Sequence, residues 1–302
     1  MSQLNWTEAQ WNRVNSAITE EFTKASVAGA FLPCYGPLGA SMETVSKQTI
    51  GFSAATITVA DNDTTPFWTV RTYVHLNSQQ VADENLSSAL FAFKRAANRL
   101  ARTEDFIVFW GYDTEKKSPP NVFRIPKPDL PEAPEEIRDF IANEQHEAEG
   151  LFTHKNIARI SIPKPPSMRG SPHPADNGAR LVTTIADAIS ELEANGYPGP
   201  FACVLGRNLF LDAQTPSEGS LVLPADRITP MLGGPLLRSG NMSKNHGIVA
   251  SSCGESLDIV VATPPKAQFL QVNEHAKYVF RVYERFVLRI KDPKAVVSIG
   301  PD

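Results

Sequence analysis

Residues suited to metal binding and acid–base chemistry gather at one place in this sequence of 302 residues. Glu144, His146, Glu147 and Glu149 stand close together, and carboxylates and imidazoles are common metal ligands and proton carriers. A proline-rich segment lies next to them, and proline excludes the regular structure that would hold four ligands in place. We therefore interpret this cluster as the solvated end of an exposed helix.

Other candidates for chemistry are weaker. His173 and Asp176 stand in a proline-rich loop with no third ligand nearby, so we predict no metal site there. The loops GPLGA and MLGGPLLRSGN match neither a phosphate-binding loop nor a dinucleotide fingerprint, and they are typical of turns. No G-x-S-x-G motif is present, and Cys34, Cys203 and Cys253 lack metal-ligand spacing, which favours reduced thiols. We expect no catalytic residues, no bound metal and no cofactor.

Composition and charge indicate a folded protein of the cytoplasm. Hydrophobic residues make up 42% and charged residues 21% of the chain, which argues against disorder. The formal net charge of −4 supplies no electrostatic reason to expect a nucleic-acid partner. The N-terminus lacks the pattern of a signal peptide, and no apolar run is long enough to span a bilayer. The length favours one large or one elaborated domain.

The elements begin with an amphipathic helix over residues 7–24. Thr7 and Gln10 form a capping-box pattern, and Trp6 and Trp11 stand where a hydrophobic staple closes. One face carries an apolar stripe at helical spacing, which we call the N-terminal stripe: Trp11, Val14, Ile18 and Phe22. This stripe either packs inside its own domain or faces a neighbouring subunit or a bound peptide.

A projecting hairpin is expected next. Residues 68–76 alternate between apolar and polar side chains, which predicts a half-exposed strand. The polar residues 61–65 and Pro66 separate this strand from the segment TITVA at 56–60, and we expect the two strands to pair. Because an isolated two-stranded ribbon is only marginally stable, pairing with another subunit is a reasonable hypothesis.

Helices and proline-rich segments follow. Residues 86–111 contain no internal glycine or proline and predict a long helix whose aromatic C-terminal end is deeply buried. Of the 24 prolines, 11 fall between Pro119 and Pro174, which favours extended segments with one short helix near 134–146. Residues 177–195 predict another helix, capped by Gly196.

Strands dominate the last third of the sequence. We expect a buried strand at 201–205, and further strands at 221–226, 247–251, 257–264 and 278–290. In the last segment the apolar residues share one face, interrupted by Glu284, while Arg281, Arg285 and Arg289 punctuate the other. Helices and strands mix without a regular βαβ repeat, so the predicted class is α+β.

One cationic loop is a candidate pore lining. Residues 233–247, GGPLLRSGNMSKNHG, join two expected strands and include Arg238, Asn241, Lys244 and His246. They form either a flexible surface loop or, in a ring of subunits, the lining of a central aperture. In the second case the repeated cationic side chains favour the passage of anions.

Taken in order, several segments resemble the encapsulin family. These are LNWTEAQWNRVNSAITEEF, YGPLGA, ENLSSALFAFKRAANRLARTEDFIVFWG, EGLF at 149–152, NGYPGPFACVLG and YERFVLRIKDPKAVVSI. The likeness covers most of the chain and rests on the order of these segments. Asn85 replaces an acidic residue before the long helix, and residues 114–148 look like an insertion. The tryptophan-bearing segment associated with flavin in some members is not visible, so no flavin is predicted.

The resemblance implies the fold of the HK97 phage capsid protein, with a peripheral domain, an axial domain and an extended loop. It assigns residues 1–44, 81–113 and 149–200 to the peripheral domain, with 114–148 as the proline-rich insertion. Residues 45–80 become the extended loop, 201–265 the axial domain, and 266–302 the C-terminal strands that return to the peripheral domain.

The resemblance also implies a function without chemistry of its own. Subunits would close into a hollow icosahedral shell in the cytoplasm around cargo enzymes that carry a terminal targeting peptide, which docks near the N-terminal helix. The family's usual cargoes are ferritin-like iron oxidases and dye-decolorizing peroxidases, which implies iron storage or oxidative-stress defence. No nucleic acid and no membrane are expected as partners.

Two other functions fit the sequence less well. A phage or prophage major capsid protein shares the fold, but it packages DNA and commonly carries a long N-terminal scaffolding segment, which we do not find before Thr7. A proteolytic enzyme or bacteriocin needs catalytic or secretory features that the sequence does not show. The shell protein is therefore the favoured hypothesis.

Overall fold

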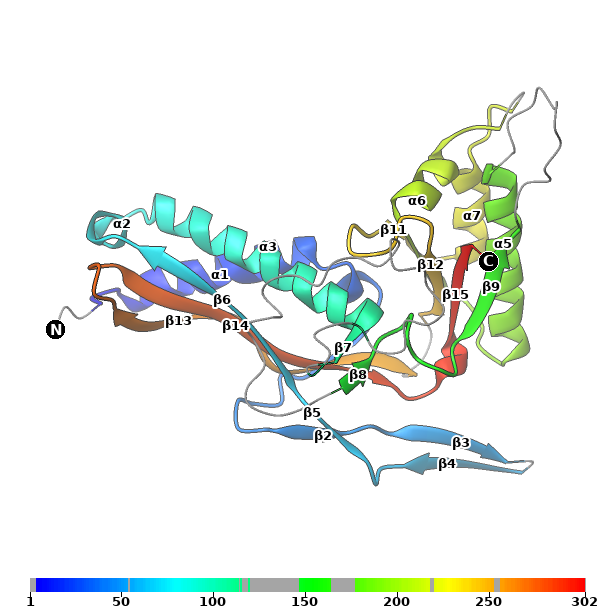
Figure 1. Cartoon of the computed structure of the whole chain (residues 1–302), viewed down its shortest axis with the longest axis horizontal. Helices are drawn as coiled ribbons and strands as arrows, with labels where there is room; N and C mark the ends of the chain where they lie inside the picture. Colours follow the sequence, from blue (N-terminus) through cyan, green and yellow to red (C-terminus); the bar gives the residue numbers. More distant parts are fainter. Residues whose placement is uncertain are drawn as a thin grey trace. The chain divides into compact units, whose positions relative to one another are not determined.

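The structure is a computed structural model that describes residues 4–53, 55–113, 115, 119, 147–163, 177–217, 220–252 and 256–301. These residues form two compact units. Unit 1 contains the described residues up to Ile107 together with Asp258–Arg289, and unit 2 contains those of Val108–Leu257 and those from Ile290 onward. Each unit combines helices with a sheet, as the α+β prediction requires (Figure 1).

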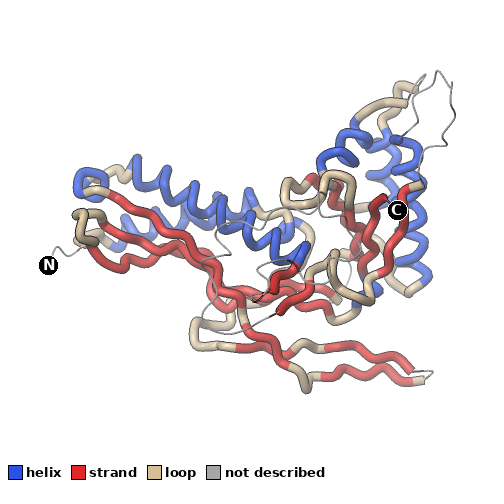
Figure 2. The backbone as a smooth tube through the Cα atoms, viewed as in Figure 1, coloured by secondary structure: helices blue, strands red, loops and turns tan. Residues whose placement is uncertain are grey.

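Unit 1 is a four-stranded sheet whose one face is covered by two long helices (Figure 2). The sheet order is β1-β13-β14-β6, with bounds Cys34–Tyr35, Leu257–Val272, Tyr278–Ile290 and Trp68–Leu76. The helices are α1 (Glu8–Ala25) and α3 (Ser87–Trp110), and the short α2 (Ser78–Ala82) precedes α3. Phe280 of β14 lies under both long helices, with ring centroids 5.3 Å from Phe93 and 6.2 Å from Trp11.

Both long helices of unit 1 have a side-chain hydrogen bond at their start, and the expected capping box of α1 is confirmed. Thr7 and Gln10 form the capping box of α1, and the Trp6 and Trp11 rings meet edge to face at 5.2 Å. At the start of α3, the Asp83 carboxylate accepts a hydrogen bond from the Ser87 backbone N–H at 2.9 Å. The last turn of α3 is buried, as its aromatic residues predicted.

Residues 44–66, the part of the expected extended loop that we call the extended loop from here on, form two short two-stranded ribbons, and their pairing differs from the expectation. Strand β2 (Thr44–Ser46) pairs with β5 (Thr64–Pro66), and β3 (Thr49–Ser53) pairs with β4 (Thr56–Ala60). The expected pairing of 56–60 with 68–76 is wrong, because β6 pairs along its whole length with β14. The sheet buries the apolar face of β6, which a pairing with the exposed β4 would leave in water.

Unit 2 is built on a five-stranded mixed sheet in the order β11-β10-β12-β15-β9. The strands are Leu236–Arg238, Phe201–Leu205, Gly247–Ser251, Val296–Pro301 and Ala158–Ile162. Helix α5 (Asn177–Ala194) packs on this sheet, and its apolar face forms a core with β10, β12 and β15. Gly196 adopts the expected left-handed conformation after α5, with φ 88°.

Two local predictions in unit 2 are wrong, and one helix is absent from the expected elements. Residues 221–226 do not form a strand, because Pro224 begins helix α7 (Pro224–Leu232), where its missing N–H is tolerated. Helix α6 (Arg207–Gln214) was not anticipated. Glu147–Glu149 form strand β8, paired with β7 (Gly111–Asp113), and not the end of a helix.

Some expectations lie outside the described residues. These are the helix near 134–146, the candidate residues Glu144, His146, His173 and Asp176, and Cys253. The assignment of chain segments to peripheral and axial domains stays a prediction. In the described part of the chain, no helix is both long and apolar enough to cross a bilayer.

Candidate functional site at the root of the extended loop

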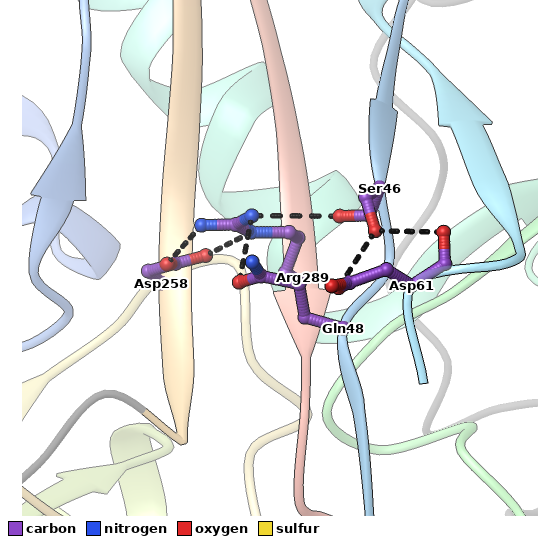
Figure 3. A network of polar contacts seen from close by, with 5 residues as sticks. All are labelled: Ser46, Gln48, Asp61, Asp258 and Arg289. Carbon is purple, nitrogen blue, oxygen red and sulfur yellow. Dashed lines mark hydrogen bonds and ion pairs between the residues drawn. The ribbon is translucent and has the colours of Figure 1, made fainter. Parts of the chain in front are cut away.

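A buried ion pair links β13 and β14, the two central strands of the unit 1 sheet. Arg289 of β14 donates from Nε to Asp258 Oδ1 at 2.8 Å and from Nη2 to Asp258 Oδ2 at 2.6 Å. The two side chains are only 6% and 7% exposed. A guanidinium and a carboxylate that meet in this two-bond geometry fix each other's orientation, so the hairpin of β13 and β14 is rigidly cross-linked here (Figure 3).

The same guanidinium reaches the first strand of the loop. Arg289 Nη1 donates to the Ser46 carbonyl oxygen at 3.4 Å and to Gln48 Oε1 at 3.2 Å. The Ser46 hydroxyl donates to the backbone carbonyl and to the carboxylate of Asp61, at 3.3 and 3.2 Å. One arginine therefore ties the outgoing strand to the sheet, and Ser46 ties it to the returning chain (Figure 3).

A second arginine holds the chain just before the loop. Arg285 donates from Nη1 to the Ala40 carbonyl at 2.5 Å and from Nη2 to the Met42 carbonyl at 2.8 Å. Its guanidinium also lies 5.7 Å from the ring centroid of Phe67, which follows the loop. We call Arg285 and Arg289 the loop anchors. The spacing of arginines along 278–290 was visible in the sequence, but their partners lie about 240 residues away and were not.

The N-terminal stripe is used for packing within unit 1. Val14, Ile18 and Phe22 are buried, and Trp11 is half-buried against the Phe280 ring. These side chains are not available to a ligand on the surface of the folded subunit. Of the two interpretations left open by the sequence, the structure therefore supports packing inside the domain for the stripe itself.

A shallow groove of about 750 Å³, largely open to solvent, lies along the polar side of α1. Its lining comes from consecutive turns of the helix and is mostly uncharged: Asn12, Asn15, Ser16, Thr19, Glu20, Thr23 and Lys24. Asn15 also accepts a hydrogen bond through Oδ1 from the backbone N–H of Ala267 at 3.0 Å, which fixes this helix to β13. The groove offers hydroxyl and amide groups to a ligand.

The candidate pore residues divide into two pairs. Arg238 and Lys244 are exposed, whereas Asn241 and His246 are buried, at 9% and 1% exposure. The Asn241 carbonyl accepts a hydrogen bond from the indole N–H of Trp110 at 2.8 Å. His246 Nδ1 lies 2.8 Å from the Ser243 hydroxyl. Asn241 and His246 thus brace the loop from inside, and only the cationic pair presents its side chains to solvent.

The acidic cluster does not build a metal centre among the described residues. Glu149 Oε2 lies 3.7 Å from His154 Nε2, and burial lowers the pKa of His154 although Glu149 opposes this effect. No group of three or more potential ligands occurs in the part of the chain that the structure describes.

The comparisons with known proteins agree with this architecture. A family model for linocin M18, described as "Encapsulating protein for peroxidase", matches residues 2–118 and 140–287. The chain belongs to the encapsulin family. Among curated encapsulins, it is 23% identical to the type 1 encapsulin shell protein EncA of Myxococcus xanthus, over 97% of this chain and 92% of the relative. It is 24% identical to the diheme-cytochrome-encapsulin shell fusion protein of Kuenenia stuttgartiensis, over 99% and 74%.

Solved structures show the same fold for this encapsulin. A virus-like particle protein from Pyrococcus furiosus superimposes with a TM-score of 0.69 at 16% identity, covering 97% of this chain and all 100% of the other. The capsid protein of myovirus phage XM1 gives 0.56 at 14% identity, with 92% of each chain covered. The HK97-like capsid fold predicted from the order of segments is therefore confirmed.

Proposed function

We propose that this encapsulin is a non-catalytic shell subunit that assembles into a hollow icosahedral compartment of the cytoplasm and encloses cargo enzymes. The observation that carries the proposal is the family match, which covers residues 2–118 and 140–287. The fold shared with a virus-like particle supports assembly into a closed particle. The enzyme chemistry then belongs to the cargo.

The extended loop supports assembly through its exposed surface. Ile57 and Val59 on β4 are 72% and 57% exposed, and β3 and β4 pair with each other alone among the described strands. A ribbon with apolar side chains in water gains stability when another chain covers it. The loop anchors fix the direction in which this ribbon leaves its own subunit. Because the root of the ribbon is already ordered, contact with a neighbouring subunit loses less conformational entropy.

Cargo docking is assigned to the polar groove along α1, and the buried N-terminal stripe serves as its support. Hydroxyl and amide side chains of the groove can satisfy the backbone of an extended terminal peptide. The family description names a peroxidase as the encapsulated protein. We accordingly propose a dye-decolorizing peroxidase or a ferritin-like iron oxidase as cargo, with a role in oxidative-stress defence or iron storage.

Solute passage is assigned to the loop between β11 and β12. Arg238 and Lys244 carry positive charge on an exposed loop, and a ring of copies would repeat this charge around an aperture. The buried Asn241 and His246 stabilise the conformation of the loop through their hydrogen bonds. Small anions would then pass more readily than cations of equal size.

Negative-stain electron microscopy of the purified protein, with ultraviolet absorbance of the same fraction, tests the assembly proposal. Uniform hollow shells with a protein-like absorbance ratio are expected. Particles filled with nucleic acid would favour the alternative function of a phage capsid protein. The phage XM1 capsid protein shares the fold of this chain. Monomers or small oligomers at every concentration would contradict the proposal.

A further inference from the structure

Two carboxyl side chains face each other in the interior of unit 1. Glu104 comes from the last turns of α3 and Glu284 from the middle of β14, and the two residues are 3% and 1% exposed. Glu284 stands in the row of β14 that points toward the helices, between the buried Val282 and Phe286. An apolar side chain would fill this place at lower cost than a carboxylate, so the pair requires a separate explanation.

The contacts of the pair indicate that it holds a proton. The Glu104 and Glu284 carboxyl groups lie within hydrogen-bonding reach of each other. Ionised carboxylates only accept hydrogen bonds, so this approach is favourable when one of the two carries a proton. Ser26 Oγ donates a further hydrogen bond to Glu104 Oε1 at 2.8 Å. Among the described residues, Glu284 Oε2 finds no hydrogen-bond partner.

The titratable groups that act on the pair are acids. Asp105, also on α3, accepts hydrogen bonds from the Val27 and Ala28 backbone N–H groups at 3.0 and 2.8 Å. Cys34 of β1 lies near both carboxyls, and Asp258 of β13, which pairs with Arg289, lies near Cys34. The charge of Glu104 opposes ionisation of Glu284. The site thus disfavours a second negative charge.

Burial sets the direction of the effect on both groups. It raises the pKa of Glu104, and the hydrogen bond from Ser26 opposes this only in part. Burial also raises the pKa of Glu284, and the neighbouring charge of Glu104 raises it further. An exposed glutamate has lost its proton well below neutral pH, whereas this pair keeps one in the folded state.

We propose that the Glu104–Glu284 pair is a proton-dependent latch that holds α3 against β14 while the two carboxyls share a proton, and loosens unit 1 when that proton is lost. The unfolded chain has both groups ionised above about pH 5, so it binds one proton fewer than the folded chain. The folding equilibrium constant should therefore fall about tenfold per pH unit until the folded pair has also lost its proton. The inference concerns the fold of the subunit and does not depend on the proposed shell function.

Urea unfolding of the full chain at a series of pH values, from about pH 5.5 to pH 9, tests the latch. Glu284→Gln and Glu104→Gln keep the shape of the pair but remove one ionisable group each. Glu274→Gln is the matched control, because Glu274 lies in the β13–β14 turn with a side chain 86% exposed. We expect each pair variant to gain stability relative to wild type as the pH rises, and the control to run parallel to wild type.

A second measurement reads the proton directly. Infrared spectra of the wild-type protein near neutral pH should contain the C=O stretch of a protonated carboxylic acid, and Glu284→Gln should remove it. If either glutamine variant does not fold, the wild-type spectrum alone decides. A missing acid band, or pH profiles of the pair variants that run parallel to wild type, would overturn the proposal.

Discussion

The guanidinium of Arg289 and the carboxylate of Asp258 form two hydrogen bonds at 2.8 and 2.6 Å in a place where both side chains are nearly inaccessible to water. A buried pair of this kind is costly to break, because removal of one partner leaves the other charge without compensation. The pair is also the point at which the sheet of unit 1 holds Ser46 and Gln48 of the extended loop.

Replacement of this anchor should weaken both the fold and the loop. Arg289→Met is expected to lower the free energy of unfolding by about 3–5 kcal/mol, the usual cost of a broken buried ion pair. Hydrogen exchange in residues 44–66 should become faster, because the loop loses its tie to β14. Urea unfolding and exchange mass spectrometry measure the two effects. Arg281→Met on the same strand is the control, and equal effects of both variants would contradict the anchoring role.

The N-terminal stripe should behave as core. Ile18 is fully buried, so Ile18→Ala is expected to lower the free energy of unfolding by about 2–4 kcal/mol through the lost methyl groups and the cavity left behind. Thr19→Ala on the exposed side of the same helix should change stability by less than about 0.5 kcal/mol. Denaturation curves separate the two. A stable Ile18→Ala shell that no longer retains cargo would show instead that the stripe is a docking surface.

Obstruction of the groove along α1 should reduce cargo loading without loss of shells. Thr19→Arg places a long charged side chain in the groove, and a penalty of about 1.4 kcal/mol would lower cargo affinity about tenfold. Glu8→Arg, on the same helix but outside the groove lining, is the matched control. Coexpression with a tagged cargo and quantification of the cargo in purified shells give the readout. If Thr19→Arg shells contain as much cargo as wild-type shells, the proposal that cargo docks in this groove is wrong.

Charge reversal on the exposed loop should change which solutes pass. Arg238→Glu with Lys244→Glu is expected to slow the passage of an anionic dye and to speed that of a cationic dye of similar size. Lys294→Glu, exposed elsewhere in unit 2, should leave both rates unchanged. Stopped-flow quenching of a reporter inside intact shells measures the rates, and the effect should shrink in high salt. Unchanged rates in the double variant would place the aperture elsewhere.

The sequence alone was sufficient to predict helices and strands whose pattern of residues lies within one short segment. The capping box at Thr7 and Gln10, the period of α5 and the strict alternation of β6 identified these elements because each depends on residues a few positions apart. The order of such segments was also enough to suggest the capsid fold.

Partners across long sequence distances required the tertiary structure. The alternation of β6 shows that one of its faces is buried, but it does not identify the neighbouring strand as β14 instead of β4. Backbone hydrogen bonds are the same whatever the side chains, so the sequence of a strand does not specify its partner. Similarly, the chain displays Arg289 and Glu284 as polar residues of one ribbon. Only folding brings them to Asp258 and Glu104, and the low dielectric of the interior turns these ordinary side chains into an anchor and a proton-holding pair.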